Sequence, residues 1–107
     1  MSPKSRFAVR FAPEVVIHLD TIESKFHSLI QKTINEQLTF EPETETRNRK
    51  LLEQPAPYEA AWELRFGPNN RFRVFYAIRE EEQEVWILAI GAKEGNRLLI
   101  AGEEFVL

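Results

Sequence analysis

The chain has 107 residues, no cysteine and a formal net charge of −3 at neutral pH. This length suits one small domain spanning residues 1–107, and the lack of thiols excludes a disulfide framework and thiolate metal sites. No apolar run approaches the ~20 residues of a membrane span, and the first residues have no signal-peptide pattern. We therefore expect a single soluble domain in the cytoplasm, with no membrane partner.

Charge is distributed unevenly along the chain. Residues 47–79 hold seven Lys and Arg against three Glu, whereas residues 12–46 and residues 80–107 each hold two against seven Asp and Glu. A basic centre between acidic flanks creates a local field, which matters more to a phosphate group than the total charge does. The centre of the chain is therefore where an anion-binding site is expected.

The amino-terminal third predicts a strand followed by helical structure. Residues 6–11 alternate between polar and apolar side chains, as strands do. Pro13 suits the first turn of a helix, and apolar residues then recur at three- and four-residue steps up to Leu38. The pattern alone permits one helix or two, but Thr21 or Ser24 can cap a second helix. A single helix of about 25 residues is unusual in so small a domain, so we favour two helices with a break near residues 20–24.

The rest of the chain predicts strands. A polar connection precedes two alternating segments, a nearly continuous apolar segment of the kind buried on both faces, and a short late segment that can add an edge strand. These are residues 43–59 for the connection, then 62–66, 72–78, 84–90 and 98–100 for the strands. Because helices and strands are segregated along the chain, we predict an α+β fold with the helices packed on one face of an antiparallel sheet.

The Gly-Pro-Asn-Asn turn at residues 67–70 determines how the two alternating strands pair. If Arg71 belongs to the loop, Phe66 faces Phe72 and every pair on that side of the hairpin is apolar. A one-residue slip would place an arginine against the apolar side and bury its guanidinium. The hydrophobic pattern therefore selects the first register.

This register sets Arg65 directly opposite Arg73, with Glu63 diagonal to Arg73. Two like charges facing each other across adjacent strands destabilise a hairpin by a few tenths to about 1 kcal/mol, and a carboxylate between them offsets part of that cost. A solvated face on which long side chains splay apart is one explanation. The other is an anion held by both guanidiniums, because planar donor forks match phosphate oxygens.

Further residues extend this predicted site. Arg47, Arg49 and Lys50 lie in the connection that leads to the hairpin, and Arg71 lies in its turn. Phe75 shares the arginine face, where a nucleic-acid base can stack on an aromatic ring. We therefore predict that these five residues contact a nucleic acid.

Three stretches together resemble the RelE/ParE superfamily of toxins from type II toxin–antitoxin systems. They are TRNRKLLEQP before the sheet, WELRFGPNNRFRVFY as the hairpin, and VWILAIGAKEGN as the last central strand with its Gly-Lys exit. The resemblance runs from about Phe7 to Lys93. It implies a compact β-α-α-β-β-β fold, with two helices near residues 13–22 and 24–38.

The resemblance also implies candidate functions. RelE-like members cleave messenger RNA in the ribosomal decoding site, ParE-like members inhibit DNA gyrase without acting as enzymes, and both are neutralised by a cognate antitoxin. A third hypothesis is an inactive member that only binds an antitoxin. The chain differs from the RelE-like pattern at Ala61 and Glu63, where lysines are usual, and residues 96–100 lack the late tyrosine of some members.

Cleavage of RNA through its own 2′-hydroxyl requires a base, a group that stabilises the added charge on phosphorus, and an acid for the leaving oxygen. Glu63 is the best base because it shares its face with the two arginines. The resemblance implies that Arg73 and Arg65 hold the phosphate, and that Lys93 after the last strand contributes a further cation. The predicted catalytic set is therefore Arg73, Arg65, Glu63 and Lys93.

We expect neither a metal nor a cofactor. His18 and His27, the only histidines, lie nine residues apart in the helical region, and this spacing does not bring two ligands to one side of a helix. We predict that both are surface or half-buried residues.

Overall fold

The computed structural model describes residues 6–105, so the first five and the last two residues of the predicted 1–107 domain lie outside the described residues. The fold is α+β, as predicted. Its helices are α1 (Val15–Asp20) and α2 (His27–Leu38), with short 3-10 turns η1 (Ser24–Phe26), η2 (Pro57–Glu59) and η3 (Pro68–Asn70). Its strands are β1 (Ala8–Phe11), β2 (Arg49–Leu51), β3 (Trp62–Phe66), β4 (Phe72–Arg79), β5 (Glu84–Glu94), β6 (Arg97–Ile100) and β7 (Glu103–Glu104).

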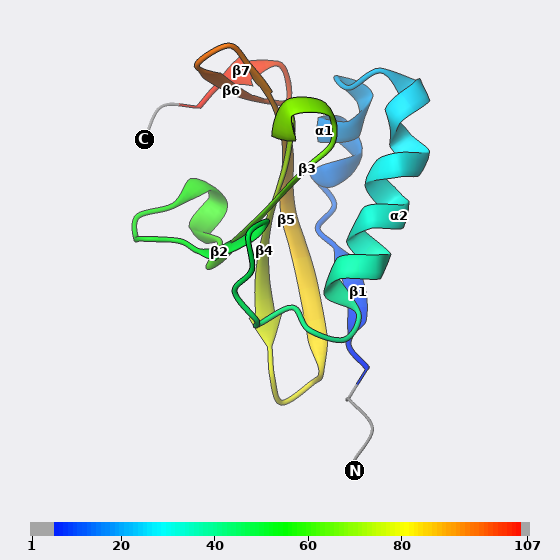
Figure 1. Ribbon diagram of the computed structural model, residues 1–107, viewed down its shortest axis with the longest axis vertical. Coiled ribbons are helices and arrows are strands. Elements are labelled where there is room, and N and C mark those ends of the chain that lie inside the picture. Colours follow the sequence, from blue (N-terminus) through cyan, green and yellow to red (C-terminus); the bar gives the residue numbers. More distant parts are fainter. Residues whose placement is uncertain (1–5, 106–107) are drawn as a thin grey trace.

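One sheet organises the described residues, in the order β2-β3-β4-β5-β6-β7. Neighbouring strands in this order are antiparallel. Strand β1 is outside this order and runs parallel to the first half of β5, whereas β6 pairs with the second half of β5. Figure 1 shows α1 and α2 together on one side of this sheet. The polar connection contains a strand, β2, that the sequence pattern did not indicate. Strand β7 follows the predicted edge strand and was not predicted either.

The helical region is broken where the sequence favoured a break. Helix α1 ends at Asp20, and the Thr21 hydroxyl donates a hydrogen bond of 2.7 Å to the carbonyl oxygen of His18. Thr21 therefore closes the first helix and does not cap the second. Ile22 lies in the break and is buried in the core, so the apolar stripe continues from α1 to α2.

The main core lies between the helices and the sheet. The predicted register is confirmed, since Phe66 pairs with Phe72 and Leu64 pairs with Val74. The apolar side chains of the hairpin meet the buried side of α2, whose inward residues Ile30, Ile34 and Leu38 are almost completely buried. Gly67 makes the turn possible because its φ of +84° is in the left-handed region, and an added Cβ would lie 2.5 Å from the Phe72 ring.

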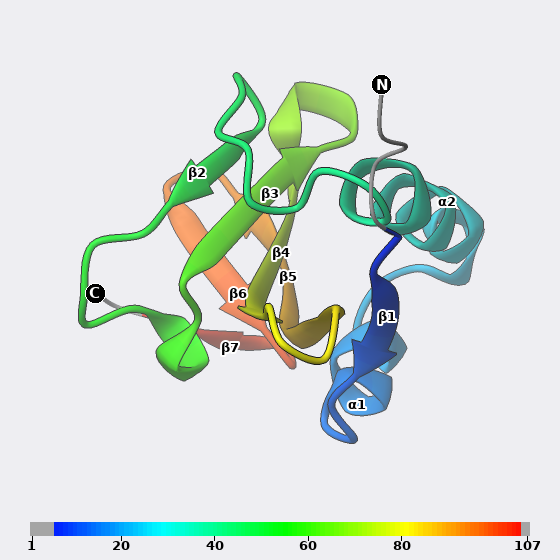
Figure 2. The ribbon, with the colours of Figure 1, turned by 90° about the horizontal axis from the view of Figure 1, so that it is seen from below.

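A second, smaller cluster lies on the face opposite the helices. Phe75 from β4, Ala89 from β5 and Ile100 from β6 are buried there together with Ala60 from the connection. Figure 2 shows that the segment between β2 and β3, which carries η2, turns beneath this face, while β6 and β7 curve toward it from the other edge. The centre of this face is therefore covered by the protein. None of the helices within residues 6–105 is long and apolar enough to cross a membrane.

His18 is buried, contrary to the prediction that it is a surface or half-buried residue. Its Nδ1 accepts a hydrogen bond of 3.2 Å from the backbone N–H of Ile90, on the part of β5 between its pairings with β1 and β6. Its ring also contacts the Tyr58 ring edge-on, with centroids 5.4 Å apart. Burial lowers the pKa of His18 below its usual value, and the charge of Glu14 opposes this only partly. His27 is half-buried, as predicted.

We therefore expect stability to fall when the pH drops below about 6.5, the usual histidine pKa. Below this pH, His18 binds a proton more readily in the unfolded chain than in the folded protein, so acid favours unfolding. This loss of stability stops growing once the pH falls below the lowered pKa of folded His18. The expected loss is on the order of 1 kcal/mol, comparable to one hydrogen bond. Urea unfolding at pH 7.5 and 5.5 checks this, with His18→Gln as the reference in which only this titration is removed. Equal pH dependence in both proteins would contradict it.

Candidate functional site

The predicted catalytic residues come together in a hollow of about 330 Å³ on the face opposite the helices. We call it the arginine hollow. Strands β3, β4 and β5 form its floor, and the chain after β6 forms one wall. Its lining includes Glu63, Arg65, Arg73, Lys93, Leu98 and Phe105. The four predicted catalytic side chains therefore line one hollow: the register placed Glu63, Arg65 and Arg73 together, and the resemblance added Lys93.

Arg65 and Arg73 are directly opposite each other, and Glu63 lies between their guanidiniums. Nε of Arg65 donates to Oε1 of Glu63 at 2.6 Å, and Nη1 of Arg73 lies 3.6 Å from Oε2. The Glu63 side chain is only 7% exposed. One buried carboxylate thus joins the two arginines, which explains how the hairpin tolerates this pair of like charges.

Each arginine nevertheless keeps donors for a ligand. The Arg65 side chain is 33% exposed and the Arg73 side chain is 11% exposed. Arg73 uses its Nε for the carbonyl oxygen of Asn70 at 3.0 Å, which leaves N–H groups on Nη1 and Nη2. Desolvation lowers the pKa of Arg73, the charge of Glu63 opposes this, and the nearby charge of Arg65 adds to it. Two cations and one anion at this position leave an excess positive charge. Exposed Lys93 adds a third cation and Glu104 adds a second carboxylate, so the charged groups that line the hollow sum to one net positive charge.

Gly91 allows β6 to lie close to β5 beside the arginine pair. It pairs with Arg73 on one side and Ile100 on the other. An added Cβ would lie 2.8 Å from the Leu99 carbonyl oxygen and 2.9 Å from the Ile100 side chain. Only glycine lets the neighbouring strand approach so closely beside the arginine pair.

The predicted RNA-binding residues separate into different positions. Lys50 is exposed on β2 and pairs with Glu63, so it lies beside the arginine hollow. Arg71 is adjacent to Lys93, whose backbone N–H donates to the Arg71 carbonyl oxygen at 2.7 Å. Arg47 is exposed in the segment before β2 and does not line the hollow.

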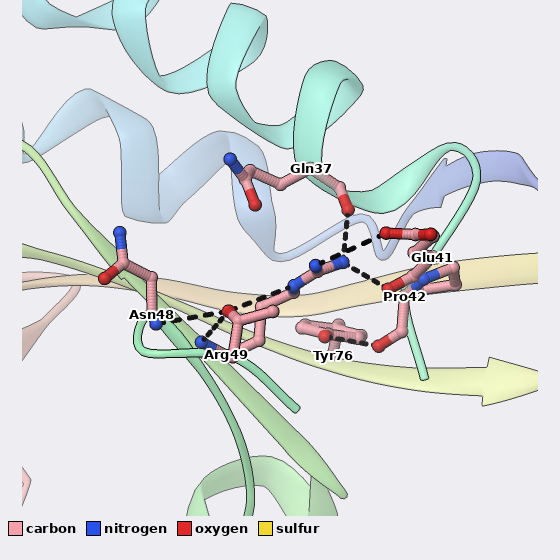
Figure 3. Close-up of polar contacts among 7 residues, drawn as sticks. Gln37, Glu41, Pro42, Asn48, Arg49 and Tyr76 are labelled. Carbon is pink, nitrogen blue, oxygen red and sulfur yellow. Dashed lines mark hydrogen bonds and ion pairs between the residues drawn. The ribbon is translucent and has the colours of Figure 1, made fainter. Parts of the chain in front are cut away.

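The prediction that Arg49 contacts RNA is wrong. Arg49 pairs with Leu64 and therefore points to the helix side of the sheet, where its side chain is 6% exposed. Figure 3 shows its guanidinium donating to the carbonyl oxygens of Gln37, at 2.9 Å, and Glu41, and lying beside the Glu41 carboxylate. It joins β2 to the end of α2 and is a structural residue.

Tyr76 completes this buried polar cluster. Its hydroxyl donates a 2.7 Å hydrogen bond to the Pro42 carbonyl oxygen, as Figure 3 also shows. Burial raises the pKa of the Tyr76 hydroxyl, which therefore remains a hydrogen-bond donor at neutral pH. The cluster fixes the connection between helix and sheet, and thereby positions β2 next to β3.

Phe75 is also not available for base stacking, because it is buried in the second cluster with 1% of its surface exposed. It does lie on the arginine face, as predicted, but the connection and the chain after β6 cover it. Phe105 instead lines the arginine hollow, together with Asn96 and Glu104. Sequence reasoning missed these three; the available signal was the apolar Phe105 following the predicted edge strand.

Metal-ligating side chains do not gather within residues 6–105. No group of three or more His, Cys, Asp or Glu residues there has an arrangement that could hold a metal ion. The chemistry available to the arginine hollow from its own lining is therefore that of carboxylates, guanidiniums and an ammonium group.

Sequence comparison identifies no matching family model and no matching curated protein. Comparison with solved structures finds a chain in the crystal structure of the toxin–antitoxin complex RelBE2 from Mycobacterium tuberculosis. The match has a TM-score of 0.68 and 21% sequence identity, and it covers 87% of this chain and 98% of that chain. The predicted RelE-like fold is therefore confirmed, and the chain has the fold of a component of that toxin–antitoxin complex.

Proposed function

We propose that the protein is the toxin of a type II toxin–antitoxin system and cleaves messenger RNA on the ribosome. The observation that carries this proposal is the arginine hollow, in which Arg65 and Arg73 contact one buried carboxylate and Lys93 lines the same hollow. The shared fold with a chain of a toxin–antitoxin complex supports it. An antitoxin partner follows from the toxin assignment, and it neutralises the protein by covering either the arginine face of the sheet or the groove along the helices.

The proposed reaction uses the RNA's own 2′-hydroxyl. Its proton passes to Glu63 while the 2′-oxygen bonds to phosphorus, and the bond from phosphorus to the 5′-oxygen breaks. The products are a 2′,3′-cyclic phosphate and a 5′-hydroxyl, whose proton comes from water or Lys93. Arg73 and Arg65 stabilise the charge that accumulates on the phosphoryl oxygens.

Glu63 has lone pairs for a hydrogen bond from the 2′-hydroxyl although it contacts both arginines. A carboxylate offers about four lone-pair positions, and Arg65 occupies one of them on Oε1. At 3.6 Å, Arg73 is in ion-pair contact with Oε2 but is too distant for a hydrogen bond. Oε2 therefore has lone pairs for the 2′-hydroxyl.

Replacing Arg73 with alanine is expected to lower the rate of cleavage of ribosome-bound mRNA by about 10²- to 10³-fold, as when a donor to a developing charge is removed. Primer extension on a defined mRNA in a purified translation system measures this. Arg73→Lys retains the charge but loses the planar fork, so an intermediate rate is expected. Arg79→Ala is the matched control, since Arg79 is on the same strand but stacks on Trp86, with its guanidinium 4.9 Å from the ring centroid.

The alternatives are distinguished by the same preparation. Intact mRNA together with inhibition of DNA supercoiling by gyrase would replace the proposal with the ParE-like function. Intact mRNA, normal supercoiling and no growth arrest in a bacterial host at good soluble expression would identify an inactive member that only binds its antitoxin. Equal cleavage by wild type and Arg73→Ala would remove Arg73 from the mechanism.

A further inference from the structure

A second hollow, of about 360 Å³, adjoins the arginine hollow at the hairpin turn. We call it the turn hollow. It is lined by Pro68, Asn69, Arg71, Arg73, Lys93 and Gly95. Arg73 and Lys93 line both hollows, so the two form one continuous surface with a shared pair of cations in the middle.

The two hollows differ in their carboxylates. Glu63 and Glu104 line the arginine hollow, whereas the lining of the turn hollow contains three cations and no Asp or Glu. Reaction at phosphorus needs a proton acceptor, but binding an unreactive phosphate needs only donors and positive charge. The turn hollow is therefore suited to hold a phosphate that is not cleaved.

Arg71 is held in a position from which it can exchange partners. Its guanidinium lies 5.5 Å from the Phe26 ring centroid and 5.4 Å from that of Phe72, which orients its plane. Its ion pairs with Glu23, at 3.6 Å, and Glu94, at 3.7 Å, are long, and both carboxylates are about half-exposed. Exposed pairs of this kind are weak, so a phosphate can displace them while the aromatic rings keep the guanidinium in place.

Three cationic residues border the turn hollow. Arg71 lies just before β4 in a helical conformation, with φ of −63° and ψ of −38°, two residues before Arg73. The backbone N–H of Lys93 donates a hydrogen bond of 2.7 Å to the Arg71 carbonyl oxygen, which joins the hairpin turn to β5. Arg71, Arg73 and Lys93 therefore line the turn hollow from two neighbouring segments.

We propose that the turn hollow is a second phosphate subsite, which binds the phosphate next to the one in the arginine hollow on the same single RNA strand. This inference rests on the proposed function. It assigns Arg71 to substrate positioning through that phosphate contact, and it assigns Glu94 as an internal competitor for Arg71.

The test compares thymidine dinucleotide, with one phosphate, and thymidine trinucleotide, with two; both lack the 2′-hydroxyl and cannot be cleaved by this route. Binding to the full chain is measured by NMR titration over a range of salt concentrations. Each phosphate neutralised on a single strand adds about 0.7 to the slope of log affinity against log salt. The wild type is expected to show this extra slope, and a higher affinity, for the trinucleotide.

Two variants should then act in opposite directions. Arg71→Gln is expected to abolish the extra slope and the trinucleotide's advantage, while dinucleotide binding remains at the wild-type value. Glu94→Gln is expected to raise trinucleotide affinity about 1.5- to 5-fold, the equivalent of one exposed ion pair. Amide spectra in the absence of ligand verify that both variants are folded.

The remaining outcomes are distinct. If the dinucleotide does not bind, the phosphate site of the proposed function fails. If the dinucleotide binds but the second phosphate adds nothing, or if Arg71→Gln weakens both ligands equally, only the second subsite is refuted. If triglutamate binds as well as the trinucleotide and responds equally to Arg71→Gln, the turn hollow is a site for an acidic peptide and the RNA subsite is likewise refuted.

Discussion

Replacing Arg49 with methionine is expected to lower the free energy of unfolding by about 1–3 kcal/mol for each buried carbonyl oxygen that loses the Arg49 donor. The change leaves the carbonyl oxygens of Gln37 and Glu41 without the donor that they have now. Methionine preserves most of the side-chain volume, so the loss reports the polar contacts and not a cavity. Urea unfolding measures it.

Lys50→Met is the matched control for Arg49→Met. It removes a cation from the next residue of β2, but Lys50 is exposed on the other face, so a change within about 0.5 kcal/mol is expected. Under conditions in which Arg49→Met is folded, its affinity for a nucleotide phosphate should match the wild type. A loss of stability no greater than that of Lys50→Met would show that water satisfies the two carbonyl groups.

The hairpin was predictable from sequence because two independent constraints agree. The turn residues place the reversal at residues 67–70, and alternation allows only one register without a buried arginine. The observed pairs Arg65–Arg73 and Leu64–Val74 follow from these local rules. The juxtaposition of Glu63, Arg65 and Arg73 depends on this register, so it was predictable to the same degree, whereas Lys93 was expected there only from the resemblance.

Arg49 and Phe75 were misassigned because long-range contacts determine their surroundings. Arg49 belongs to a three-residue strand, too short for its alternation to be recognised, and only pairing with β3 turns it toward the core. Phe75 alternates correctly onto the arginine face, but whether that face is covered depends on the path of residues 52–60 and on β6. Neither path has a periodic signal in the sequence.

Glu63 contacts both arginines and is also the proposed base. The change Glu63→Gln is expected to distinguish these two roles. If Glu63 is the base, this change should lower cleavage of ribosome-bound mRNA by about 10²- to 10⁴-fold. Loss of its charged hydrogen bond to Arg65 should also lower the free energy of unfolding by about 1–3 kcal/mol. Affinity for a nucleotide phosphate should rise, because the neutral amide competes for the two guanidiniums less strongly than the carboxylate does.

The combination of lost cleavage and gained affinity distinguishes a base from a residue that only holds the arginines in place. A purely structural Glu63 would, when replaced, release Arg65 and Arg73 from their shared position, and phosphate affinity and cleavage would then decline together. Glu53→Gln makes the same chemical change on the exposed connection and should leave all three quantities unchanged. Since Glu63 is the carboxylate that lets two opposed arginines share one face, undiminished cleavage by Glu63→Gln would mean that the proton is accepted elsewhere and that the arginines hold the phosphate without this charge.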